Sequence, residues 1–532
     1  MNYREPLQRY PRPHLSPVTM ESATGVATSR SANPQSGRIQ PQATAVFLIV
    51  SSLFFSSAVV AAKNWSINPG ISLSETYSDH VAPSSAQIDE ADFVTQINPE
   101  LRAELNGRRI QADLNYRMQN IQYARNSERS TQQQYLAGAS AEILPEHFFI
   151  DTSSTLTQRN INTNGVRVNN NYAITDNRAD QLTASIRPSW HQPMGSYAEA
   201  LLDYEHGIVR FSGDGVSGTT APDSRLDATS LTINSLSGAR RLSWKFNVQG
   251  QQIVYDNSAF DDLKLRNTGL QIGYRIIPTL SPLALIGYDD NDFGNRLTST
   301  DPTGTFWALG FHWQPNARSE FEYLTGHRFF GNTHRVTWRQ RGRYITSELS
   351  YSEEISGEAS ATLKGVSLID NPGVYSNSNL GVTGDVFVSK IARASARYEK
   401  SRTSITLTPY SEKREFENSQ QENVDGISGT WEWAFAPRNT LALNLHWDKT
   451  DAGAGNNQTF SWSELQLERQ LGKQASASIG YSFTKSDSDN EQVAYTENAL
   501  GAQLTYRFGT PAQQKSVPST RYSGKKQREL QF

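Results

Sequence analysis

The residues best suited to chemistry in this sequence are a few acidic and histidine side chains that stand close together along the chain. His446 and Asp448 are two residues apart, and two such side chains lie on one face of an extended strand. They form a candidate ligand pair, although the alternation around them favours a solvated strand face. Glu353 and Glu354 are adjacent and would point to opposite faces of a strand, so they are not expected to pair as acid and base.

A third group is an acidic segment whose carboxylates could bind a divalent cation: Asp289, Asp290 and Asp292. Solvation of an exposed loop explains the same residues. The nine histidines are scattered without metal-ligand spacing, and the absence of cysteine excludes thiolate sites and disulfides. The sequence contains no G-x-S-x-G, Walker, H-E-x-x-H or EF-hand motif. We therefore expect no enzyme activity and no catalytic, metal-binding or cofactor-binding residues.

The elements that must carry these residues are long β-strands. Apolar residues occupy mostly odd positions from Phe93 to Leu105, with polar or charged residues between them, and the alternation resumes from Ile110 to Met118 after the Asn106-Gly107 turn. Similar alternation recurs at 242–248, 307–313, 441–447 and 475–483. By this criterion the segments run about 10 to 14 residues, whereas soluble strands usually have about 5 or 6. Their length indicates strands that cross a membrane.

The connections between these strands alternate in length. Short turns such as Pro145-Glu146 and Gly472-Lys473 alternate with long polar segments such as 161–177, 212–225 and 354–384. Outer-membrane barrels have this asymmetry, with tight periplasmic turns and larger external loops. We therefore predict an all-β, transmembrane, antiparallel up-and-down β-barrel of about 22 strands over residues 63–508. It would lie in a Gram-negative outer membrane with both termini in the periplasm, and the longest connection, 354–384, is the candidate for folding inward.

The strand face that is predicted to line the aqueous lumen carries both positive and negative side chains. A pore dedicated to one ion sign would show a ladder of that sign, whereas a mixed lumen suits neutral or weakly charged hydrophilic solutes, including sugars. The net charge of −3 predicts no nucleic-acid partner. The candidate lumen-lining residues are Glu100, Arg102, Glu104, Arg109, Asp113, Arg117 and Lys245.

Residues 1–62 have the pattern of an N-terminal extension that ends in a signal peptide. A basic segment precedes an uncharged apolar run at 43–60, and the small residues Ala61 and Ala62 follow it. This pattern predicts cleavage between Ala62 and Lys63. A membrane-anchoring helix is the alternative, because the run is near the lower length limit for a span. Translation could also begin at Met20 instead of Met1.

The last predicted strand has a recognisable spacing. Its residues give G-x-x-L-x-Y-x-F and resemble the terminal-strand signal that the barrel assembly machinery reads: Gly501, Leu504, Tyr506 and Phe508. A basic tail, 509–532, follows in place of the chain end. We expect this tail to be disordered and solvated in the periplasm.

Several stretches resemble one family of outer-membrane proteins. They are SETYSD at 74–79, DFVTQINPEL at 92–101, LNYRMQN at 114–120 and, less distinctly, residues 386–415. The family is the outer-membrane β-barrel family associated with PEP-CTERM/exosortase systems, whose genes accompany exopolysaccharide biosynthesis and export clusters. The resemblance spans most of residues 65–508. It implies an outer-membrane location and a link to exopolysaccharide production, and it offers no catalytic residues to carry over.

These observations support three functional hypotheses. The first is a porin-like conduit for a hydrophilic solute or polysaccharide in exopolysaccharide export. The second is a non-conducting scaffold of the exopolysaccharide or surface-protein anchoring apparatus. The third, an outer-membrane enzyme, lacks a visible catalytic constellation, and a soluble periplasmic β protein is the remaining alternative. The expected partners are outer-membrane lipid, the barrel assembly machinery, polysaccharide and other export proteins.

Overall fold

The computed structural model describes residues 65–83, 91–126, 129–162, 165–213, 222–236, 241–257, 260–293, 302–357, 386–416, 421–451, 453 and 457–508. The chain divides into two units, Met1–Ala62 and Lys63–Phe532, and every described residue belongs to the second. The predicted signal peptide, its cleavage site at Ala62 and Lys63, and the basic tail lie outside the described residues. In the described part, no helix is long and apolar enough to cross a membrane.

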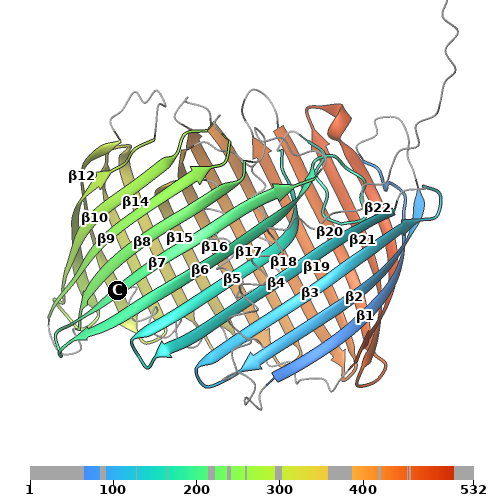
Figure 1. The fold of residues 1–532 in the computed structure, drawn as a ribbon, viewed down its shortest axis with the longest axis horizontal. Helices are drawn as coiled ribbons and strands as arrows, with labels where there is room; N and C mark the ends of the chain where they lie inside the picture. Colours follow the sequence, from blue (N-terminus) through green and yellow to red (C-terminus); the bar gives the residue numbers. More distant parts are fainter. Residues whose placement is uncertain are drawn as a thin grey trace, which may run out of the picture. The chain divides into compact units, whose positions relative to one another are not determined.

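The second unit is built from 22 strands and one short 3₁₀ helix, η1 (Glu491–Val493), among the described residues (Figure 1). The strands have 10 to 17 residues, which matches the length needed to span a bilayer at a tilt. Their bounds are β1 (Trp65–Ser78), β2 (Asp92–Asn106), β3 (Ile110–Tyr123), β4 (Arg129–Leu144), β5 (Phe148–Asn160), β6 (Arg178–Met194), β7 (Ala198–Ser212), β8 (Ser224–Ser235), β9 (Leu242–Tyr255), β10 (Leu263–Tyr274), β11 (Leu280–Asp290), β12 (Thr303–Asn316), β13 (Ser319–Arg328), β14 (Gly331–Arg341), β15 (Ile345–Ser356), β16 (Phe387–Lys400), β17 (Thr403–Phe416), β18 (Gln421–Ala436), β19 (Asn439–Asp451), β20 (Asn457–Gln470), β21 (Ala475–Ser488) and β22 (Tyr495–Arg507).

The sheet closes on itself. Each strand pairs antiparallel with its sequence neighbours, and β1 pairs with β22 from Gly70↔Arg507 to Ser78↔Ala499. A closed sheet gives every strand a neighbour on both sides, whereas an open sheet would leave two whole strand edges unpaired in the bilayer. The prediction of a 22-strand, antiparallel outer-membrane barrel is therefore confirmed, and the protein belongs in the outer membrane.

Residues two apart share one face of the wall, as the alternation predicts. On β1 and β2, Leu73 and Ile97 are exposed on the outer face, whereas Ser72 and Asn98 are buried on the inner face. Apolar side chains thus meet lipid and polar side chains meet the interior along these strands.

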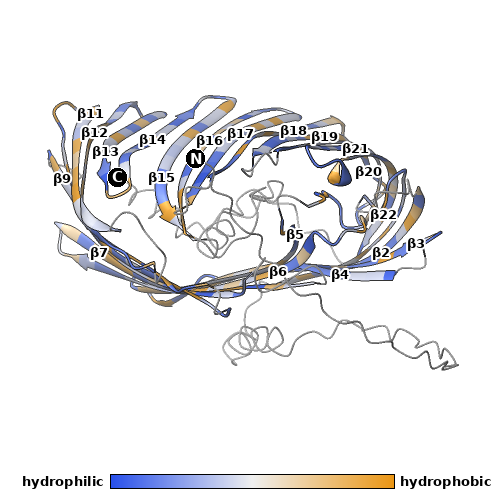
Figure 2. Ribbon diagram, turned by 90° about the horizontal axis from the view of Figure 1, so that it is seen from above, coloured by the Kyte–Doolittle hydropathy of each residue, from blue (hydrophilic) through white to orange (hydrophobic). Residues whose placement is uncertain are grey.

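The wall curves strongly where β11–β13 turn back toward β9 (Figure 2). Two glycines permit this bend. A Cβ on Gly310 of β12 would lie 1.8 Å from the carbonyl oxygen of Tyr323, and a Cβ on Gly326 of β13 would lie 1.9 Å from that of Trp307. The two strands therefore approach more closely than any residue with a side chain allows.

Candidate functional site

A segment of the β5–β6 connection, Gly165–Asn177, lies inside the barrel and contacts strands on two sides. One set of contacts comes from β3–β5 and the other from β19–β22. These two groups of strands lie on opposite sides of the β1–β22 seam. We call residues 165–177 the crossing segment.

The first side of the crossing segment is held by amide side chains. Asn171 Nδ2 donates to Gln119 Oε1 on β3 at 2.6 Å, and Gln132 Nε2 on β4 donates to the Asn171 carbonyl at 3.1 Å. Asn160 Nδ2 on β5 donates to the carbonyl oxygen of Val168 at 3.1 Å. Hydrogen bonds with backbone carbonyls on this side fix the path of the chain as well as its side chains.

The second side of the crossing segment faces β20–β22. The Tyr495 hydroxyl on β22 donates to the Arg167 carbonyl at 2.6 Å, and Gln458 Nε2 on β20 contacts the Gly165 carbonyl at 3.5 Å. Val166, Val168 and Ala173 pack with Val493 and Tyr495 in a buried apolar cluster. Apolar burial adds to the polar contacts that hold the segment against this part of the wall.

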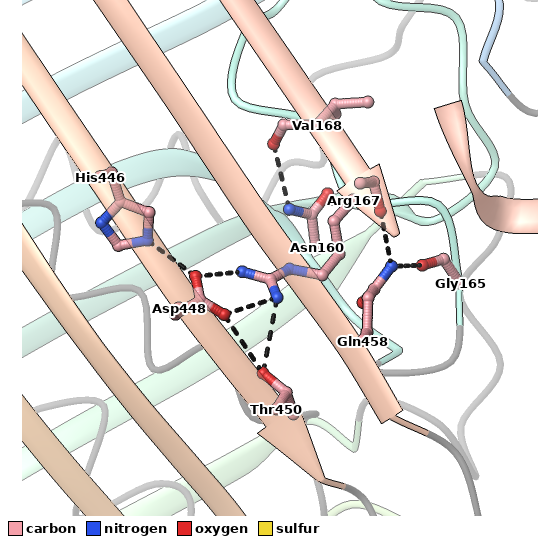
Figure 3. Close-up of polar contacts among 9 residues, drawn as sticks. Asn160, Gly165, Arg167, Val168, His446, Asp448, Thr450 and Gln458 are labelled. Atoms are coloured by element: carbon pink, nitrogen blue, oxygen red, sulfur yellow. Dashed lines mark hydrogen bonds and ion pairs between the residues drawn. The ribbon is translucent and has the colours of Figure 1, made fainter. Parts of the chain in front are cut away.

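Arg167 is the centre of this arrangement (Figure 3). Its two terminal nitrogens each lie 2.8 Å from one carboxylate oxygen of Asp448 on β19, so the pair is bidentate. The Arg167 side chain is 4% exposed and the Asp448 side chain is fully buried. His446 Nε2 lies 2.8 Å from Asp448 Oδ2, and the guanidinium lies 4.6 Å from the ring centroid of Phe460. Asp448 is thus paired on both oxygens, as burial of a charge requires.

A second buried carboxylate holds the crossing segment near its middle. Glu497 on β22 accepts from the Ser78 hydroxyl at 2.7 Å and from Asn170 Nδ2 at 3.1 Å. Tyr172, in the crossing segment, has Glu497 as an electrostatic neighbour. Burial raises the pKa of the Tyr172 hydroxyl well above its usual value, and the neighbouring Glu497 raises it further. Tyr172 therefore stays protonated and remains a donor to this carboxylate.

A second cluster of inward side chains is apolar. Inward side chains of β6–β10 form a buried cluster with the first residues before β16 and the last residues of β15. Gly357, directly after β15, lies so close that an added Cβ would be 3.0 Å from Ile253 Cδ1 and 3.1 Å from Leu263 Cδ2. We call this set the inner apolar cluster; it comprises Ile161, Ala179, Val209, Phe211, Leu226, Ile253, Tyr255, Leu263 and Val386, with Phe260, Leu265, Phe293 and Ile355 packed against it.

Five of the seven predicted lumen-lining residues lie together on β2 and β3, and three of them make polar contacts. Arg117 pairs with Glu100 at 2.9 Å, and Arg102 Nε donates to Asn115 at 2.7 Å. Glu104 and Asp113 face each other in the β2–β3 ladder. Arg117 and Asp113 lie at two-residue steps from Gln119, which contacts the crossing segment.

The remaining two predicted residues lie apart from this group. Lys245 lies on β9 between Asn234 and Gln271, at two-residue steps from Ile253 of the inner apolar cluster. Arg109 lies in the exposed turn before β3 and not in a strand. The structure thus does not gather the seven predicted residues into one site, and their contact with a transported solute stays a prediction.

The other chemical candidates lie in ion pairs or in the strand ladder. The solvated interpretation of His446 and Asp448 is wrong for Asp448, because Arg167 covers it. Glu353 and Glu354 face Lys390 and Ser389 across the β15–β16 ladder, on opposite strand faces as predicted. The three acidic residues at 289–292 each pair with a separate cation: Arg328, Arg266 and Lys264. Among the described residues, no group of three His, Asp or Glu side chains is placed to hold a metal ion.

The residues of the predicted assembly signal lie at the seam. Gly501, Leu504 and Tyr506 pair with Thr76, Leu73 and Ile71 of β1, and the Phe508 amide donates to the Pro69 carbonyl at 2.7 Å. They therefore close the barrel, while their recognition by the assembly machinery stays a prediction.

Sequence reasoning missed Arg167 and the crossing segment. The only signal in the sequence was a Val-Arg-Val alternation inside an Asn-rich connection, at residues 166–168. The predicted inward connection, 354–384, lies mostly outside the described residues, so that prediction is not decided. The shorter β5–β6 connection does enter the barrel.

Solved structures similar to this chain resemble it at low sequence identity. No protein-family model matches the chain, and no curated protein matches it. Similar solved structures include the FrpB iron transporter from Neisseria meningitidis, with 9% identity, TM-score 0.45 and coverage of 84% of this chain and 83% of that one. A ferric enterobactin receptor (PfeA) from Pseudomonas aeruginosa has 9% identity, TM-score 0.47 and coverage of 84% and 81%. The siderophore receptor PirA from Acinetobacter baumannii has 8% identity, TM-score 0.43 and coverage of 84% and 81%.

The predicted link to exopolysaccharide is corrected by these findings. The similar structures are named as iron and siderophore proteins, and nothing among them points to polysaccharide. The prediction of an exopolysaccharide conduit or scaffold, with polysaccharide and export proteins as partners, is therefore wrong. The resemblance to the exosortase-associated family is not tested by these comparisons.

Proposed function

We propose that this protein is a gated transport barrel of the outer membrane, closed at rest by the crossing segment. The buried, bidentate Arg167–Asp448 pair carries the proposal. It links a connection between β5 and β6 to a strand thirteen positions further along the chain, so displacing the segment must break it. A connection that served only to join two strands would not need a fully buried ion pair.

The energetics of the pair support a gate and not a permanent plug. Removing one partner of a buried ion pair typically costs about 3–5 kcal/mol, because the other charge is left unpaired. A polar ligand that offers its own carboxylate or amide groups could replace these bonds. The crossing segment therefore has one bonded, closed position, and a ligand that replaces these bonds would release it.

The position of the segment supports opening from outside. It belongs to one of the long connections, and in outer-membrane barrels these lie on the external face. A ligand that arrives from the medium would meet the segment before the rest of the interior. We therefore propose that the barrel takes up a ligand from the medium.

Single-channel recording in planar bilayers tests the gate. Wild-type protein is expected to be closed most of the time, and Arg167→Ala is expected to raise the open probability about tenfold or more, since each 1.4 kcal/mol corresponds to a factor of ten. Arg187→Ala is the matched control, because Arg187 pairs with Asp151 within the wall at 3.5 Å and does not contact the segment. Heat-modifiable migration on gels verifies that each variant is folded.

Two results would contradict the proposal. A wild-type barrel that conducts continuously would show that the crossing segment does not close it. An Arg167→Ala barrel that is folded and no more open than Arg187→Ala would show that the pair does not hold a gate.

A further inference from the structure

Three polar side chains stand in one row across β7, β8 and β9: Glu199, Asn234 and Lys245. Asn234 is the ladder partner of both Glu199 and Lys245, so the three lie side by side on one face of neighbouring strands. That face is the inner one, because Asn234 lies at two-residue steps from Leu226 of the inner apolar cluster. The row therefore presents an anion, an amide and a cation to the interior, in this order.

The amide group of Asn234 is buried without hydrogen bonds. Asn234 is 9% exposed, and within the described part of the chain neither its Oδ1 nor its Nδ2 has a hydrogen-bond partner. The next row has the usual arrangement, since the Thr232 hydroxyl there donates to Asn247 Oδ1 at 3.1 Å. Because a buried amide without partners is unfavourable, Asn234 favours a ligand that both accepts and donates hydrogen bonds.

The two charged side chains of the row are available for such a ligand. Among the described residues, no side chain forms a hydrogen bond or an ion pair with Glu199 or Lys245. The charged neighbours of Lys245 are Arg335 and Glu322, which pair with each other at 3.3 Å. Glu199 and Lys245 are also partly exposed, so solvent reaches them. One negative and one positive group therefore stand on the two sides of the buried amide.

The spacing of the row limits the size of the ligand. Neighbouring strands lie about 4.8 Å apart, so the backbones of β7 and β9 are about 10 Å apart at this row. Charge-assisted hydrogen bonds of about 2.8 Å at both ends leave about 4 Å between the ligand atoms that make them. An ammonium and a carboxylate on the same carbon atom have nearly this separation.

We propose that this row binds the zwitterionic head of an α-amino acid. The carboxylate of the ligand would accept hydrogen bonds from Lys245 Nζ and Asn234 Nδ2, and its ammonium would donate to Glu199 and to Asn234 Oδ1. One ligand thereby compensates both charges and both polar atoms of the buried amide. A simple anion would leave Asn234 Oδ1 without a donor and would lie close to the Glu199 carboxylate. The inference rests on the barrel fold and not on the gate.

Saturation-transfer NMR on the whole protein in detergent micelles tests the site with L-alanine. Propionate lacks the ammonium group and ethylamine lacks the carboxylate, so these two are the matched ligands. We expect L-alanine to bind about tenfold or more tightly than either, because each of them loses charge-assisted hydrogen bonds. Both ends of the barrel meet the solution in a micelle, so binding does not require the crossing segment to move.

Two results of this comparison would overturn the proposal. Propionate that binds as tightly as L-alanine would make the row a simple anion site. The absence of any L-alanine binding would show that the row holds no amino acid, whatever the conductance of the protein.

Substitutions assign the binding to the row. Lys245→Gln and Glu199→Gln should each weaken the binding of L-alanine about tenfold or more. Glu199→Gln should leave the binding of propionate unchanged, because propionate has no ammonium group for Glu199 to bind. Lys264→Gln is the matched control, since Lys264 on β10 lies on the opposite strand face from Leu263 of the inner apolar cluster and pairs with Asp292 at 3.2 Å.

Heat-modifiable migration verifies that each variant is folded. Equal binding of L-alanine to wild type, Lys245→Gln and Glu199→Gln would place the ligand elsewhere and contradict the proposal. The comparison of the three ligands on wild-type protein decides the class of ligand even if one variant does not fold.

Discussion

At the scale of single residues, the gate depends on the chemistry of a guanidinium. Arg167 contacts both oxygens of Asp448 and lies over the ring of Phe460 at the same time. A lysine would offer a point charge without the paired donors, so it would not reproduce this contact. Tyr172 plays a related role, since its neutral hydroxyl can donate to a buried carboxylate only while it keeps its proton.

Tyr172 should make the closed state sensitive to alkaline pH. A folded-state pKa raised above the usual value of about 10 stabilises the closed state fully below that pH, and this contribution is lost as the pH rises above it. We expect open probability to be constant to about pH 9 and to increase above pH 10. In Tyr172→Phe the Tyr172-dependent part of this increase should disappear. The same increase in both proteins would assign the alkaline opening to other groups.

At the scale of elements, the shape of the barrel depends on where its strands can approach. Gly310 and Gly326 let β12 and β13 bend together at the strongest curve, and the inward leucines fill the space behind them. The direction of β15 has the opposite effect, because its inward turn leaves β14 with a short ladder. Local packing therefore decides where neighbouring strands approach closely and where the ladder between them is short.

Gly310→Ala should prevent assembly of the barrel, because the added Cβ would overlap the Tyr323 carbonyl oxygen. Gly250→Ala on β9 is the control, since nothing lies within 4 Å of a Cβ at that position. Heat-modifiable migration and resistance to protease in outer-membrane fractions measure assembly. A folded Gly310→Ala barrel in normal yield would show that the backbone relaxes at this bend.

At the scale of the whole molecule, 22 strands close into one wall that turns apolar side chains outward. Two features of its interior link distant strands: the polar contacts of the crossing segment, and the inner apolar cluster, to which the ends of β15 and β16 contribute. The orientation in the membrane follows from the lengths of the connections, if the long ones face the medium.

Cysteine labelling in intact cells tests this orientation. Glu491→Cys lies in η1, between β21 and β22, and Lys473→Cys lies in the short turn before β21. A membrane-impermeant maleimide should label Glu491→Cys in intact cells and Lys473→Cys only after the outer membrane is permeabilised. The reverse pattern would place the short turns outside and would contradict the predicted periplasmic termini.

The sequence by itself determined the strands, their two faces and their closure into a barrel of 22. The alternation of apolar and polar residues is a local property with a period of two, and the lengths of the connections are read directly from the sequence. Both can therefore be recognised without knowledge of distant contacts. The contact of Arg167 with Asp448 and the short β14–β15 ladder were decided only by the tertiary structure. The first joins residues 281 positions apart, and the second depends on how β15 packs against β9 and β10. Neither contact corresponds to a periodic pattern in the sequence, because each depends on which strands and connections meet when the sheet closes.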